Sequence, residues 1–126
     1  MAEPKFDSKE IEAGKGMAIL SYIIALIPYF AEKNNKFARY HAVQGMNILI
    51  VAAGYGIIVT ILTSILSGIA LSTYNLGMLG FVGVLSLILS LGYALIGILD
   101  LIGLIYAATG KAQEVPILGK IKIIKK

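Results

Sequence analysis

The sequence predicts an all-α membrane protein, a three-helix transmembrane bundle forming a single integral membrane domain over residues 1–126. The first observation is composition, because 58% of the residues are hydrophobic and only 14% are charged. The second is the stretch from Tyr40 to Gly110, in which Asp100 is the only Asp, Glu, Lys or Arg. Hydrocarbon rejects charge and requires each segment to satisfy its own backbone polar groups, so long uncharged helices are typical of chains that span a bilayer.

Three apolar segments give the predicted spans. The first covers residues 14–31 and the second covers residues 41–66. Residues 67–77 are uncharged but rich in Ser, Thr, Asn and Gly, which is typical of a loop. The third span covers residues 78–109, which is too short for two spans and a turn. We therefore expect one long, tilted third helix with a kink near Gly92.

Basic residues flank the apolar segments and predict an orientation. The net charge is +4, and the basic side chains lie near the N-terminus, in the first loop and in the basic tail, residues 111–126. Basic residues favour the cytoplasmic face, so we expect a multi-pass protein of the cell membrane with its N-terminus outside and its C-terminus cytoplasmic. Four spans would place the basic first loop outside, which disfavours that alternative. Three residues are expected to contact lipid headgroups, namely Lys36, Arg39 and Lys111.

Polar side chains recur at one depth of the predicted bundle. Asp100 lies six residues before Tyr106, and Asn47 lies six residues after His41. Helices rise about 1.5 Å per residue, so Asp100 and Asn47 are each about 9 Å from the same membrane face. We predict an intramembrane polar cluster there, consisting of Asp100, Asn47, Gln44, His41 and Tyr22.

Asp100 has two interpretations, and they imply different functions. An ionisable group in a membrane is costly and often marks an ion or proton pathway, as in a small transporter or permeation element. The alternative is a neutral carboxyl that hydrogen-bonds between helices in a non-enzymatic packing subunit or scaffold. Relays usually contain several ionisable groups, whereas Asp100 stands alone below His41. The sequence therefore favours the packing subunit.

Small residues recur along the third segment at steps of three, four or seven. On a helix such positions share one face, and small side chains let another helix approach closely in a membrane. This pattern predicts helix packing, with self-association or a membrane protein as partner. The residues are Gly83, Ser86, Ser90, Gly97 and Gly103.

The residue inventory predicts that the protein is not an enzyme. The chain has no cysteine and a single histidine, so thiol chemistry and a thiolate metal site are excluded. His41 has no second histidine or suitably spaced carboxylate to share a metal ion. We expect no catalytic residue, metal or cofactor. Nucleic acid is not an expected partner, because the basic residues flank apolar segments.

Three short motifs resemble a known family. They are ILSY (residues 19–22), FARYHAVQ (residues 37–44) and ATGKAQEVPILG (residues 108–119). Together they resemble a family of small prokaryotic membrane proteins similar to the twenty-kilodalton subunit of the chloroplast inner-envelope protein import (Tic) complex. The resemblance covers Met17 to Gly119 and implies a helical membrane subunit. For the plastid relatives it also implies a role in protein translocation, although the plastid subunit has four membrane helices.

Overall fold

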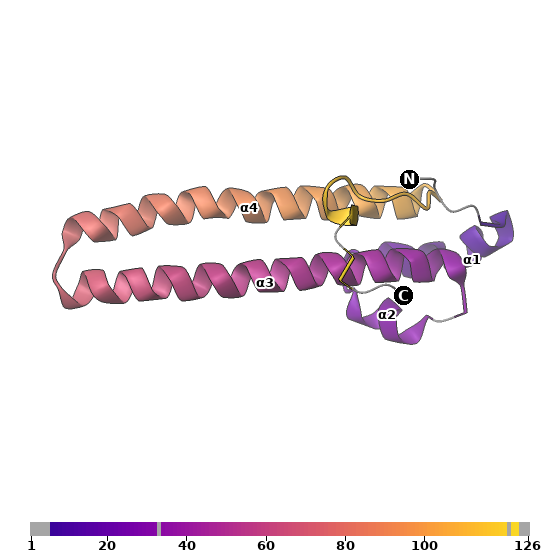
Figure 1. Cartoon of the computed structure of the whole chain (residues 1–126). Coiled ribbons are helices and arrows are strands. Elements are labelled where there is room, and N and C mark those ends of the chain that lie inside the picture. The colour runs from indigo at the N-terminus through magenta and orange to yellow at the C-terminus, as the bar shows by residue number, and fades with distance from the viewer. Residues whose placement is uncertain (1–5, 33, 121, 124–126) are drawn as a thin grey trace. The chain divides into compact units, whose positions relative to one another are not determined.

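The computed structural model describes residues 6–32, 34–120 and 122–123, and this part of the chain is all-helical, as predicted. Lys33 of the first loop and part of the basic tail lie outside the described residues. Two helices, α3 and α4, are long and apolar enough to cross a membrane. The elements in order are α1 (Ser8–Leu20), α2 (Leu26–Ala31), α3 (Lys36–Ser72), α4 (Leu76–Ala108) and the short 3-10 helix η1 (Leu118–Lys120) (Figure 1).

The chain divides into two compact units. Unit 1 comprises Met1–Ile50 with Ile96–Lys126, and unit 2 comprises Val51–Leu95. Unit 1 therefore holds α1, α2, the first part of α3 and the last part of α4. Unit 2 holds the remainder of α3 and α4 with the turn that joins them.

Residues 14–31, predicted as the first span, do not form one helix, so the three-helix bundle is not confirmed. α1 has 13 residues and α2 has 6, with turns between them. Pro28 explains the break, because it has no N–H to donate to the Ile24 carbonyl and its ring would clash with that carbonyl in a continuous helix. Pro28 instead lies in the first turn of α2, where a proline is tolerated.

The loop predicted over residues 67–77 is also shorter, because α3 and α4 both extend into it. At the end of α3 the Thr73 hydroxyl donates to the Ile69 carbonyl at 2.7 Å, so this polar residue is satisfied by the helix itself. Asn75 caps the N-terminus of α4, since its Oδ1 accepts a hydrogen bond from the Met78 backbone N–H at 3.0 Å. A polar composition therefore did not prevent helix formation here.

In unit 2, the two helices pack through a reciprocal pair of tyrosines and glycines. The rings of Tyr55 on α3 and Tyr93 on α4 stack with centroids 4.9 Å apart. Each ring lies over the glycine beside the other tyrosine, Tyr55 over Gly92 and Tyr93 over Gly56. The Tyr55 hydroxyl donates to the Leu89 carbonyl at 2.5 Å. Gly92, predicted as a kink position, thus provides room for the Tyr55 ring within a continuous α4.

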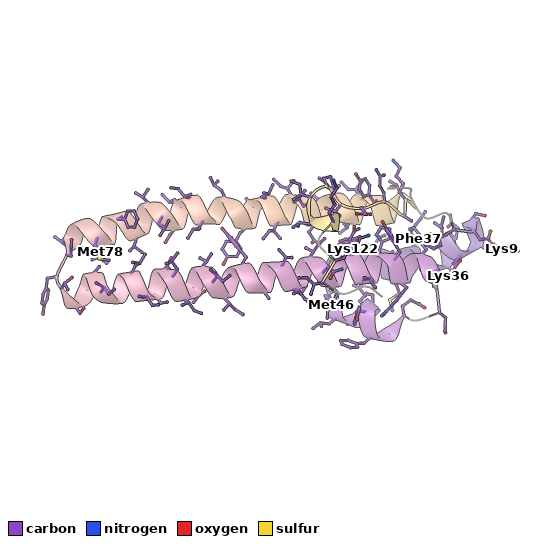
Figure 2. The ribbon with its side chains drawn as sticks, viewed as in Figure 1. Lys9, Lys36, Phe37, Met46, Met78 and Lys122 are labelled. Carbon is purple, nitrogen blue, oxygen red and sulfur yellow. The ribbon has the colours of Figure 1, made fainter. Side chains whose placement is uncertain are left out.

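In unit 1, the start of α3 is tied to the first turn of α1. The Asn35 Oδ1 accepts from the Ala38 N–H at 2.9 Å and caps α3, while its Nδ2 donates to the Glu10 carbonyl at 2.8 Å. The Glu10 carboxylate also accepts from the Lys36 N–H at 2.7 Å. Phe37 follows and is completely buried. Figure 2 shows Lys36 and Phe37 at this end of α3.

Candidate functional site

Three polar side chains of unit 1 form a buried hydrogen-bonded network, which we call the polar network (Tyr22, His41 and Gln44). His41 and Gln44 lie three residues apart on α3 and therefore share one face of that helix. Tyr22 comes from the turn between α1 and α2. Its hydroxyl lies 2.5 Å from His41 Nδ1, and Gln44 Nε2 donates to the same hydroxyl at 2.6 Å. The break in the first segment thus places Tyr22 against α3.

The partners of the polar network assign its protons. His41 Nε2 lies 2.8 Å from the Lys111 carbonyl oxygen, which can only accept, so Nε2 carries a proton. In a neutral imidazole Nδ1 is then the acceptor, and Tyr22 donates to it. The network is a directed chain from Gln44 through Tyr22 to His41.

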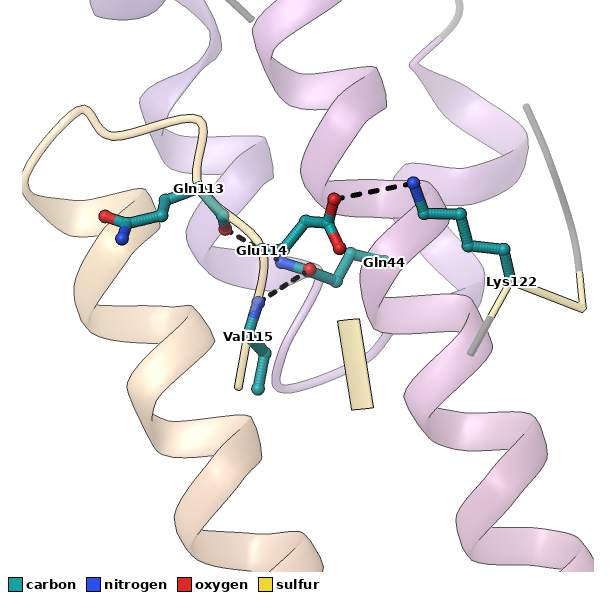
Figure 3. Close-up of polar contacts among 5 residues, drawn as sticks. All are labelled: Gln44, Gln113, Glu114, Val115 and Lys122. Atoms are coloured by element: carbon teal, nitrogen blue, oxygen red, sulfur yellow. Dashed lines mark hydrogen bonds and ion pairs between the residues drawn. The ribbon is translucent and has the colours of Figure 1, made fainter. Parts of the chain in front are cut away.

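Gln44 also holds the segment that follows α4, which we call the tail segment (residues 111–118). Its Oε1 accepts from the Val115 N–H at 2.9 Å, and its Nε2 lies 3.4 Å from the Gln113 carbonyl oxygen (Figure 3). The side-chain amide therefore pairs with the tail backbone as a neighbouring strand would. Val115 is 1% exposed, and its position before Pro116 favours the extended backbone that this pairing needs.

A second, weaker contact lies beside this pairing. Lys122 Nζ and Glu114 Oε1 are 3.5 Å apart, and both side chains are partly exposed (Figure 3). An ion pair in contact with solvent contributes little to stability, because water and salt screen it. The buried amide contacts, and not this ion pair, therefore hold the tail segment on α3.

The remaining members of the predicted polar cluster lie nearby in unit 1. Asn47 is one turn beyond Gln44 on α3 and is 4% exposed. Asp100 on α4 is partly buried and lies three residues before Gly103, the position that lies against the Tyr22 ring. The structure thus joins Tyr22, His41 and Gln44 by hydrogen bonds and places Asn47 and Asp100 close to them.

The small residues predicted on the third segment are mostly exposed in this chain. Gly83, Ser86, Ser90 and Gly97 all lie on the exposed surface of α4. Gly103 differs, because a Cβ there would lie 2.4 Å from the Tyr22 ring. Gly103 thus lies on the face that α4 buries in unit 1, together with Leu99 and Ala107. Packing of the exposed small residues against another molecule stays a prediction.

The predicted headgroup residues divide into two groups. Lys36 and Lys111 are exposed, as a headgroup contact requires. The Arg39 guanidinium instead lies 4.4 Å from the centre of the Tyr29 ring and donates to the Tyr29 carbonyl. Arg39 therefore already fixes α2 to α3 within the chain.

Among the described residues, no group of three or more His, Cys, Asp and Glu side chains is arranged to hold a metal ion. No protein-family model, curated protein or solved structure matches this chain. The resemblance to the import-complex subunit therefore rests on the three sequence motifs alone.

Proposed function

We propose that this chain is a small, non-enzymatic integral membrane protein that acts as a helix-packing subunit or scaffold. The membrane assignment is supported by α3 and α4, which have 37 and 33 residues. A span needs about 20. Only 6% and 11% of their most apolar windows are buried within the chain, unlike the core helix of a soluble protein. Ile58, Leu87 and Leu91 are 67%, 71% and 68% exposed, and lipid would cover them.

The closed polar network is the observation that favours a subunit over a transporter. Both His41 ring nitrogens and both ends of the Gln44 amide have partners inside the chain. A buried network in which donors and acceptors are matched fixes one arrangement of the elements that supply them. This network joins α3 to the turn before α2 and to the tail segment, which is a structural role.

The exposed small residues of α4 supply the surface for a partner, either a second copy or another membrane protein. Close approach of backbones at such a surface drives association where lipid removes the hydrophobic incentive. The motif resemblance adds protein translocation as the setting of that partnership. Purification from native membrane in mild detergent identifies the partner.

The surface itself is tested by mutation. Ser90→Leu should lower the oligomer mass or the yield of the co-purified protein, since Ser90 lies on the exposed small-residue face. Leu95→Phe is the matched control, because Leu95 is 51% exposed but does not belong to that set. Equal oligomer mass and equal partner yield for wild type and both variants would contradict the packing role.

Asp100 supports a second candidate, a small permeation element. It is a partly buried acid within an apolar helix, three residues before Gly103, which lies against the Tyr22 ring. Acids in such positions are frequently part of ion or proton pathways. A flux that depends on Asp100 would favour this candidate over the scaffold.

A further inference from the structure

We propose that α1 and α2 form a re-entrant hairpin (residues 8–31) that enters and leaves one leaflet, so that α1 begins on the same membrane face as the tail segment. The proposal rests on the membrane assignment made above. It replaces the predicted first span and, with it, the expectation that the N-terminal region and the tail segment lie on opposite faces.

The path of the hairpin along α3 is the first argument. Glu10, near the start of α1, is bonded to Asn35 and Lys36. The Ser21 carbonyl then lies against Gly45, where a Cβ would be 2.2 Å from the oxygen. Gly45 is about 14 Å along the helix from Lys36 at about 1.5 Å per residue.

The second half of the hairpin returns to its starting level. After α2, the Glu32 carboxylate accepts from the Asn35 N–H at 3.0 Å. The chain has therefore advanced along α3 as far as Gly45 and come back to the residue that also holds Glu10. The depth reached is about half of the hydrocarbon core, which is about 30 Å thick. A span cannot begin and end beside the same residue.

The tail segment lies at the same end of unit 1. Lys111 is bonded through its backbone carbonyl to His41 in the second turn of α3, and Val115 is bonded to Gln44 about one turn farther along that helix. Gly110 lies beside α1, since a Cβ there would be 3.1 Å from Ile11 and 3.8 Å from Lys15. α1, the start of α3 and the end of α4 at Gly110 thus meet at one end of unit 1, so α1 begins at the membrane face where α4 ends.

Lipid acyl chains are the occupant that fits the outer face of the hairpin. One side of the turn and α2 packs on the chain, with Ser21, Ala25 and Pro28 buried. Exposed basic side chains at Lys9 and Lys36 lie at the open end of the hairpin, where anionic headgroups would be (Figure 2). The opposite side is apolar and 46–63% exposed, and consists of Ile23, Ile24, Leu26, Ile27 and Phe30.

Cysteine labelling with a membrane-impermeant reagent tests the topology, because the chain has no native cysteine. Single cysteines replace exposed Ser8 in α1, Gln113 in the tail segment and Tyr74, which is 92% exposed in the turn before α4. We expect Ser8→Cys and Gln113→Cys to react from one side of sealed vesicles and Tyr74→Cys from the other. Reaction of Ser8→Cys together with Tyr74→Cys would restore three spans and overturn the hairpin. Reaction of all three from one side would instead overturn the membrane crossing of α3 and α4.

Tryptophan quenching identifies the occupant, because the chain has no native tryptophan. Phe30→Trp places the probe on the hairpin and Ile58→Trp places it on α3, at positions 63% and 67% exposed. In phosphatidylcholine–phosphatidylglycerol vesicles containing brominated acyl chains, we expect both tryptophans to be quenched. Quenching of Ile58→Trp alone would show that protein covers the hairpin and would overturn the proposal. Quenching of neither would overturn the membrane assignment itself.

Discussion

At the scale of single residues, Gln44 makes the most consequential contact. Its amide bonds two elements that are far apart in sequence, the turn at Tyr22 and the tail segment at Val115. Both contacts are buried, so removal of the amide would leave polar groups without partners and without water. A buried donor or acceptor left in that state typically costs about 1–3 kcal/mol.

Gln44→Leu should therefore release the tail segment. We expect the Val115 amide proton to exchange with deuterium much faster and the free energy of unfolding to fall by about 1–3 kcal/mol. Gln113→Ala is the matched control, because only the backbone carbonyl of Gln113 pairs with Gln44. Val115 exchange that is as slow in Gln44→Leu as in the control would show that the amide pairing does not hold the tail.

Tyr22, His41 and Gln44 could be selected from the sequence because helix rise places polar residues at comparable depths. Their partners could not be selected in the same way. Lys111 and Gln113 participate through backbone carbonyls, and every residue type has one, so the pattern of side chains contains no signal. Val115 precedes Pro116, which favours an extended backbone but does not indicate what the segment would contact.

At the scale of elements, the apolar periodicity predicted helices correctly but not their limits. Residues 14–31 are apolar enough to be counted as a span, yet hydropathy ignores where a proline falls within the run. Pro28 cannot donate to the Ile24 carbonyl, so a continuous helix would be kinked or broken there, and α1 ends at Leu20. α3 and α4 contain no proline and continue through Ser, Thr and Gly that suggested a loop.

The contact between α3 and the hairpin depends on Gly45. A Cβ there would lie 2.2 Å from a backbone oxygen, which cannot rotate away as a side chain can. We expect Gly45→Ala to lower the free energy of unfolding by about 1–3 kcal/mol, as overpacking does elsewhere. Gly54→Ala on the same helix meets nothing within 4 Å and should leave stability unchanged or raise it.

Thermal unfolding of both variants in the same detergent provides the measurement. Helix propensity alone would make both alanines stabilising, since alanine is the better helix former. Gly45→Ala that melts at or above the temperature of Gly54→Ala would therefore show that the hairpin does not approach α3 so closely.

At the scale of the whole molecule, composition decides the class and contacts decide the arrangement. The stretch from Tyr40 to Gly110, in which Asp100 is the only charged residue, predicts long apolar helices from composition alone. α3 and α4 are long and apolar, as this prediction requires. The path of the chain before α3 depends on a few local contacts, above all those of Glu10 and Glu32 with Asn35. Such contacts join residues of ordinary polar loops, so composition could not predict that residues 14–31 form two short helices.

The role of Asp100 distinguishes a scaffold from a permeation element for the molecule as a whole. In a scaffold, Asp100→Asn keeps hydrogen-bonding capacity and cannot ionise, so the protein should be equally stable or more stable. Sealed vesicles that contain wild-type protein and a trapped pH-sensitive dye should conduct protons no faster than vesicles alone.

Asp7→Asn is the control for this flux measurement, because Asp7 is an exposed acid at the start of α1 whose side chain makes no capping hydrogen bond. A proton flux present in wild type and Asp7→Asn but lost in a folded Asp100→Asn would assign the molecule to the permeation class.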